Sequence, residues 1–211
     1  MDRLDNKNII QPKVTDQQLS DQARKSWRGT SRLADSFDQW SLGLAIYTFI
    51  DTYKQISPEE LDELSNLMKG KNVVDLGCGA NGPEFAKLYL GLGANSYTGV
   101  TLNWIDENED YQENIINPST KLIHDEALDY LLHQDDNSLD LITSNGFLCS
   151  ELTSTDEYSQ SVFKHINRVL KPNGNFIATH FDEKMKTLAE KTGLIPLNND
   201  KAVSLYSKKS L

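Results

Sequence analysis

The stretch VVDLGCGANG, residues 73–82, decides the fold of this chain. It begins with the apolar residues of a buried strand and runs directly into glycines at positions 77, 79 and 82. The spacing G-x-G-x-x-G is that of a dinucleotide-binding loop, where a pyrophosphate lies against backbone N–H groups at the start of a helix. We therefore expect a strand, a ligand-binding loop and a helix here, but the glycines alone do not identify the ligand.

Strands and helices are expected to alternate after this loop. Apolar runs predict strands at 72–76, 96–101, 120–124, 138–144 and 174–180, and helical periodicity places helices between and after them at about 82–91, 105–114, 126–133, 155–170 and 182–191. Such alternation predicts a doubly wound α/β fold with a mostly parallel sheet covered on both faces. The final segment, LIPLNNDKAVSLYSKK at 194–209, predicts an antiparallel hairpin at the sheet's edge, because its central Asn-Asn-Asp is a turn sequence. The sheet is therefore expected to have seven strands.

The residues before the first strand carry helical patterns. A capping box, TDQQ at 15–18, predicts a short helix. Apolar residues at three- and four-residue intervals over 33–50 predict a second helix, and SPEE at 57–60 has the N-cap serine and first-turn proline of a third. We expect residues 1–70 to form a helical extension or lid, and residues 71–211 to form the sheet domain.

Composition and charge narrow the class of protein. The chain has 211 residues and a formal net charge of −10, which argues against nucleic acid as a partner because such binding rests on Lys and Arg. It contains no apolar leader and no run of about 18 apolar residues, so we expect a cytoplasmic protein without a membrane span. Its two cysteines, Cys78 and Cys149, fit a reducing compartment, and no cysteine or histidine cluster predicts a metal site.

Two acidic positions bear on the ligand of the glycine loop. A nicotinamide dinucleotide would call for an acid about 20 residues further on to bind the ribose, and Thr101 stands there instead. The following LNWIDENED, residues 102–110, contains four acids and no base, and would repel a 2′-phosphate. Asp75 lies two residues before Gly77. A carboxylate there would not stabilise a bound pyrophosphate, but it would strongly stabilise a cationic ligand.

The string D-x-G-x-G formed by Asp75, Gly77 and Gly79 resembles the first motif of class I S-adenosylmethionine-dependent methyltransferases. That family's cofactor carries a sulfonium and an ammonium group and no phosphate, which agrees with the charge argument. The resemblance continues through HDEAL at 124–128, NSLDLITSNGFL at 137–148 and INRVLKPNGNFIATH at 166–180, in the order of the family's third, fourth and fifth strands. It covers roughly residues 70–207.

The resemblance implies roles for individual residues. Asp75 would lie near the methionine end of the cofactor, while Asp125 would accept from the exocyclic amine of adenine and Glu126 would offer its backbone N–H to the ring. The family usually ends its second strand with an acid that holds the ribose; here Thr101 and its neighbours would bind the ribose hydroxyls as neutral partners. The full cofactor set implied is Asp75, Gly77, Cys78, Gly79, Thr101, Leu102, Asn103, Asp125, Glu126 and Asn145.

The acceptor site is less legible in the sequence, because methyl transfer chiefly needs alignment and the exclusion of water. His180 ends the fifth strand and is the candidate general base. Gly146 and Phe147 follow the fourth strand and are expected to line the methyl site. In many members of the family that the chain resembles, helices before the first strand cover the cofactor. The resemblance therefore makes Trp27, Arg28 and Tyr47 candidates for substrate binding.

We therefore expect an S-adenosylmethionine-dependent methyltransferase that acts on a small-molecule acceptor. One alternative is an NAD-dependent oxidoreductase that uses the same glycine loop. Another is a non-catalytic relative that keeps the fold for interaction or regulation, which Thr101 in place of the ribose-binding acid would allow.

Overall fold

The computed structural model describes residues 14–25, 58–79, 82–102, 117–145, 147–148, 155–179, 182–198 and 203–208. Within these ranges seven strands form one sheet in the order β3-β2-β1-β4-β5-β7-β6. The pairs among β1 to β5 are parallel, and β7 pairs antiparallel with β5 and β6. The strands are β1 (Asn72–Leu76), β2 (Ser96–Thr101), β3 (Thr120–His124), β4 (Leu139–Asn145), β5 (Leu170–Thr179), β6 (Leu194–Pro196) and β7 (Val203–Lys208).

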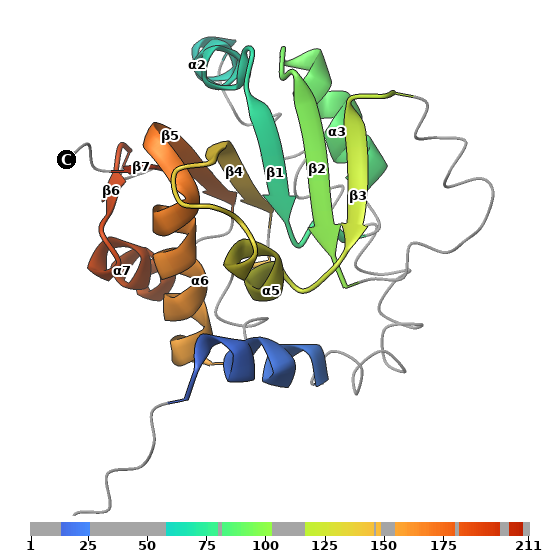
Figure 1. The fold of residues 1–211 in the computed structure, drawn as a ribbon. Helices are drawn as coiled ribbons and strands as arrows, with labels where there is room; N and C mark the ends of the chain where they lie inside the picture. The colour runs from blue at the N-terminus through green and yellow to red at the C-terminus, as the bar shows by residue number, and fades with distance from the viewer. Residues whose placement is uncertain are drawn as a thin grey trace, which may run out of the picture.

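Helices cover both faces of this sheet (Figure 1). One core cluster joins α5, α6, α7 and Leu19 of the first helix to the sheet, and a second joins α2 and α3 to the opposite face. The first helix spans residues 16–25 and is called here the N-terminal helix. The labelled helices are α2 (Pro58–Met68), α3 (Gly82–Gly91), α5 (Ala127–Leu132), α6 (Asp156–Val169) and α7 (Glu183–Lys191).

The alternation of side chains along β1 explains how one strand serves both cores. Val74 and Leu76 belong to the core under α5 and α6, whereas Val73 belongs to the core under α3. Period-two alternation places Asp75 on the same side as Val73. A carboxylate is thus carried into the α3 side of the sheet, one residue before the strand ends.

The strand order fixes where a ligand can approach. From β1 the chain continues to β2 and β3 on one side, and then returns to place β4 on the other side of β1. Such a switch point leaves a crevice outside the carboxyl ends of the two strands, and ligands of open α/β sheets bind there. The glycine loop follows β1, and Phe147 and Leu148 follow β4, so both segments lie at this edge.

The structure confirms the predicted α/β fold, including the terminal antiparallel hairpin. The capping box is present, because Thr15 Oγ1 accepts from the Gln18 N–H and the Gln18 side chain accepts from the Thr15 N–H. β5 begins four residues earlier than predicted: Leu170 pairs with Leu139 before the register shifts between Leu139 and Leu141. The helices predicted at 33–50 and 105–114 lie outside the described residues. Within the described ranges, no helix has the length and apolar character needed to cross a membrane.

Candidate functional site

Asp75 is the centre of a buried polar cluster beneath the glycine loop. Its side chain is fully buried and accepts hydrogen bonds from Tyr97 Oη at 3.0 Å and Thr143 Oγ1 at 2.9 Å. The Asn145 amide nitrogen lies 3.4 Å from the carboxylate and also donates to Tyr89 Oη at 2.8 Å. Parallel pairing explains the arrangement, because Asp75 and Thr143 are register partners on β1 and β4. The cluster therefore ties the ends of these strands together at the switch point.

The charge of Asp75 is only partly compensated by these partners. Burial raises the pKa of Asp75 to about 6, although hydrogen bonds from Thr143, Tyr97 and Asn145 favour the ionised form. Burial and the adjacent Asp75 charge also raise the pKa of Tyr97, so that its hydroxyl stays a donor. No lysine or arginine within the described ranges hydrogen-bonds to Asp75. A buried carboxylate with neutral partners suits a neighbouring cation.

The first glycine of the loop makes room for Phe147. Gly77 has φ +74°, and a Cβ there would lie 2.4 Å from both Cβ and Cγ of Phe147. Both the left-handed backbone and the close approach therefore require glycine. The Gly77 and Cys78 N–H groups donate to the Val100 carbonyl at 2.8 and 3.2 Å, which anchors the loop on β2. The structure thus brings together Gly77 and Phe147, which were predicted for cofactor and acceptor respectively.

Two further residues of the predicted cofactor set, Cys78 in the loop and Thr101 at the end of β2, are buried. The Cys78 thiol fills space beside Gly82 and Gly99. Burial raises the pKa of this thiol. Thr101 is also buried, and its carbonyl accepts from the Asp125 N–H at 3.0 Å, while the Leu102 carbonyl lies 3.1 Å from His124 Nε2. The ends of β2 and β3 are therefore joined where the ribose and adenine groups were predicted.

Asp125 and Glu126 use their polar groups in different ways. Asp125 Oδ1 accepts from the Glu126 N–H at 2.8 Å, so the backbone donor predicted for the adenine ring is directed to Asp125 in this structure. The Glu126 side chain is buried as the N-cap of α5, accepting from the Asp129 N–H at 3.0 Å and from Ser20 Oγ at 2.6 Å. It also accepts from the Tyr158 hydroxyl.

Sequence reasoning missed the residues of the N-terminal helix that meet this segment. Arg24 Nη2 lies 2.7 Å from Asp125 Oδ1 and 2.6 Å from Asp129 Oδ2. At the other end of the helix, Asp16 accepts from Ser161, Lys164 and His165 of α6. A signal was available: Asp16, Ser20 and Arg24 recur every four residues and so share one helix face.

Several predicted site residues lie outside the described residues: Asn103, Gly146, His180, Trp27, Arg28 and Tyr47. Their assigned roles stay predictions. Within the described ranges, no group of three or more His, Cys, Asp or Glu side chains could hold a metal ion.

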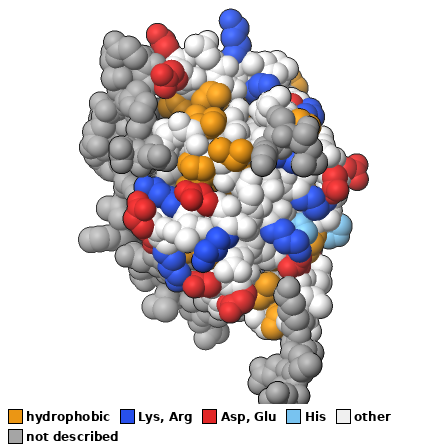
Figure 2. All heavy atoms as spheres, turned by 90° about the vertical axis from the view of Figure 1, so that its left-hand side faces the viewer, with side chains coloured by type: hydrophobic (Ala, Val, Ile, Leu, Met, Phe, Trp, Pro, Cys, Tyr) orange, Lys and Arg blue, Asp and Glu red, His pale blue; other side chains and the backbone are white. Residues whose placement is uncertain are grey.

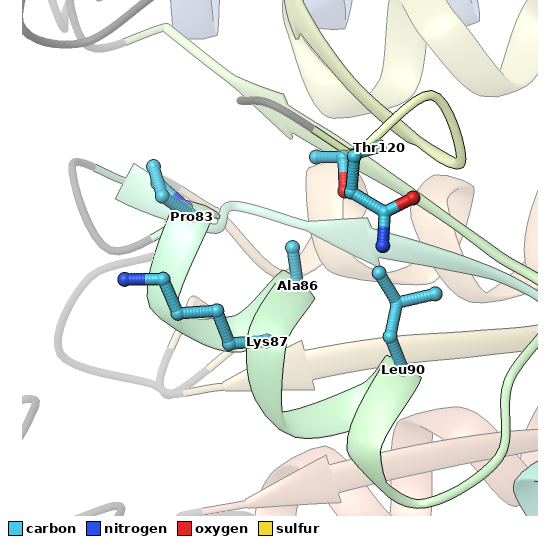
Figure 3. Close-up of a pocket in the computed structure, with 6 residues that line it drawn as sticks. Pro83, Ala86, Lys87, Leu90 and Thr120 are labelled. Carbon is cyan, nitrogen blue, oxygen red and sulfur yellow. The ribbon is translucent and has the colours of Figure 1, made fainter. Parts of the chain in front are cut away.

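A shallow pocket of about 210 Å³ lies elsewhere on the surface, between α3 and the start of β3 (Figure 3). Ala86, Lys87 and Leu90 line one side, and Asn117 and Thr120 line the other. Thr120 is the first residue of β3, so this pocket extends toward the amino ends of the strands. Pro83, which follows Gly82 at the start of α3, also lines the pocket.

Comparison with known proteins agrees with this geometry. Residues 74–178 match the family described as "Methyltransferase domain". No curated protein matches the chain significantly in sequence.

Solved structures share the fold at low sequence identity. A methyltransferase solved with the Trm112 activator of Haloferax volcanii has 15% identity and a TM-score of 0.55, with 84% of this chain and 97% of that chain covered. A Listeria monocytogenes protein assigned as an S-adenosylmethionine-dependent methyltransferase has 14% identity and a TM-score of 0.51, with 72% and 97% covered. Phosphoethanolamine N-methyltransferase 1 of Haemonchus contortus has 17% identity and a TM-score of 0.51, with 81% of this chain and 34% of that chain covered.

The family match spans the glycine loop, the Asp125 segment, β4 and most of β5, and the strand order agrees with the predicted seven-stranded sheet. The chain therefore belongs to the methyltransferase domain family.

Proposed function

We propose that this chain transfers the methyl group of S-adenosylmethionine to a small-molecule acceptor at the carboxyl ends of β1 and β4. The observation that carries the proposal is the buried Asp75 carboxylate under the glycine loop, whose described hydrogen-bond partners are all neutral. A ligand with an ammonium and a sulfonium group supplies the missing positive charge, whereas a pyrophosphate would add a second negative one.

The residues at this edge would bind the cofactor along its length. Asp75 and the Gly77 to Gly79 turn would receive the methionine portion, and Thr101 and Leu102 lie where the ribose would be held. Asp125 is about a quarter exposed in its side chain and would accept from the adenine amine. Asn103 and Asn145 complete the proposed set, and Glu126 would act through Asp125, to which its backbone N–H donates. When bound, the cofactor supplies an electrophilic methyl carbon.

The protein's part in the reaction is alignment and shielding. An in-line displacement needs the acceptor atom opposite the sulfur and water kept away. Phe147 packs against Gly77 and would form an apolar wall next to the methyl site, together with Gly146. His180 would take a proton from an acceptor that still carries one. We propose that Trp27, Arg28 and Tyr47 close the acceptor side as part of a lid formed by residues 1–70.

Charge supports a small acceptor over a nucleic acid. The chain has a formal net charge of −10, and Figure 2 shows acidic and basic side chains interspersed on the face that it views. Charged side chains also pair between α6 and α7, as Lys184 does with Asp156 at 2.5 Å. A phosphate backbone would need an uninterrupted basic surface.

Titration calorimetry with S-adenosylmethionine and S-adenosylhomocysteine tests the cofactor site. Asp75→Asn keeps the shape and removes the charge, and should weaken binding by at least about tenfold. Asp140→Asn is the matched control, because Asp140 lies near the opposite end of β4, where it pairs with Lys171. Equal affinity of the Asp75→Asn variant would contradict the role of Asp75, and binding of NADH alone would contradict the cofactor site as a whole.

The acceptor class is tested by following radiolabelled methyl groups from S-adenosylmethionine. Purified chain should label acceptors in a protein-free, nuclease-treated small-molecule extract. Label recovered only in RNA, DNA or protein would contradict the small-molecule proposal.

A further inference from the structure

The N-terminal helix is anchored at both ends on the segment and helices that follow β3 and β4 (Figure 1). Near its start, Asp16 accepts from Ser161 at 2.6 Å and lies 2.9 Å from both Lys164 and His165. Near its end, Arg24 pairs with Asp125 and Asp129. Leu19 and Ser20 between them are buried. Polar anchors at the two ends of the helix thus flank the buried contacts of Leu19 and Ser20, and of these two end anchors only the second reaches Asp125.

The bonds to Asp125 define the orientation of its carboxylate. Oδ1 accepts from Arg24 Nη2 at 2.7 Å and from the Glu126 N–H at 2.8 Å. Neither bond uses Oδ2, and about a quarter of the side chain remains exposed. Two donors on one oxygen hold the plane of the group and leave the other oxygen for a ligand. A backbone donor alone would leave the carboxylate free to rotate about Cβ–Cγ.

Building on the proposed cofactor site, we propose that Arg24 is a positioning residue for recognition of the cofactor's base: by holding Oδ1 of Asp125, it directs Oδ2 at the exocyclic amine of adenine. The consequence is selectivity. An ionised carboxylate only accepts hydrogen bonds, so it binds the 6-amino group of adenine and repels the 6-carbonyl oxygen of hypoxanthine. That selectivity depends on a fixed carboxylate, and hence on an arginine 101 residues away in the chain.

The test compares two probes, S-adenosylhomocysteine and S-inosylhomocysteine. The bases of these probes differ in the group at C6, amino or carbonyl, and in the proton that hypoxanthine carries on N1. Calorimetric titration of the full chain gives the ratio of their dissociation constants. Arg24→Gln should weaken binding of S-adenosylhomocysteine about tenfold and bring the ratio toward one, with S-inosylhomocysteine changing less. Arg24→Lys keeps a positive donor and should restore part of the ratio.

The control is Asp16→Asn, which weakens the other anchor of the same helix. It should lower the melting temperature in the way that Arg24→Gln does, yet leave the ratio of the two dissociation constants as in the unchanged chain. Loss of the ratio in Asp16→Asn would overturn the inference, because docking of the helix as a whole would then be responsible.

Other results separate this inference from the proposed function. If the unchanged chain binds S-adenosylhomocysteine and Arg24→Gln binds both probes with the same ratio, the inference fails while the cofactor site stands. Tighter binding of S-adenosylhomocysteine by Arg24→Gln would also overturn it, because Arg24 would then compete with adenine for Asp125. If the unchanged chain binds neither probe, the proposed cofactor site fails and the inference fails with it.

Discussion

Replacing Asp75 with asparagine should make the ligand-free protein more stable at neutral pH. The carboxylate is fully buried, and burial raises its pKa from the ordinary 3.8 to about 6. At about 1.4 kcal/mol per pH unit, this difference amounts to a penalty of about 3 kcal/mol for folding with the group ionised. Asparagine carries no charge but fits three donors less well, which costs about 1 to 2 kcal/mol. The net gain is therefore about 1 to 2 kcal/mol.

The pH dependence distinguishes this cause from others. Since the folded-state pKa lies above the unfolded value, the folded state binds more protons between about pH 4 and 6. As the pH rises through this window, the stability of the unchanged chain should fall relative to that of Asp75→Asn, and above pH 6 the difference should level off. A gain of about 1 to 2 kcal/mol corresponds to about 2 to 5 °C in melting temperature for a chain of 211 residues.

Thermal unfolding followed by circular dichroism from pH 4 to 8 measures the effect. The control Asp140→Asn should change the stability in the opposite direction. Although burial raises the pKa of Asp140, hydrogen bonds from Lys171 and the Asn72 backbone lower it below the ordinary range. Its ion pair stabilises the fold above the unfolded pKa, so Asp140→Asn should lose stability at neutral pH and recover as the pH falls. A stability difference for Asp75→Asn that does not vary between pH 4 and 8 would refute the reasoning.

Two further substitutions test the packing of the site by urea denaturation. Gly77→Ala should lower the free energy of unfolding by about 3 kcal/mol or more, because it adds a steric clash with Phe147 to a left-handed backbone. Gly70→Ala, at φ +72° with open space around it, should lower it by only about 1 kcal/mol. Equal losses in the two variants would contradict the clash with Phe147. Tyr158→Phe should lose about 1 to 3 kcal/mol by removing a donor from the buried Glu126 carboxylate, and an unchanged midpoint would show that the remaining donors suffice.

The fold was predictable because its signals are local. The glycine loop fixed a strand and a helix within ten residues, and the capping box at Thr15 predicted a helix that the structure contains. β5 was the least well placed strand, since Pro172 and Gly174 are turn residues by local preference. Pairing of Leu170 with Leu139 extends the strand through them, and only the neighbouring strand supplies that information.

The site was predictable only in part, because its contacts are distant in sequence. Asp75 and Asp125 were predicted as site residues from motifs, whereas the partners of their side chains were not predicted. Thr143 is 68 residues from Asp75, and Arg24 is 101 residues from Asp125. Such pairs depend on strand register and helix docking, which no local pattern of residues encodes.

The anchoring of the N-terminal helix has a consequence for the order in which the molecule assembles. A helix of ten residues is marginal alone in water, and its hydrogen-bond partners Glu126, Ser161 and His165 lie 106 to 149 residues further along the chain. At 5 to 20 residues per second, roughly ten to thirty seconds of synthesis separate the helix from its last partner. The N-terminal helix therefore leaves the ribosome well before α5 and α6, and it docks, with the ion pair between Arg24 and Asp125, only after α6 has been synthesised.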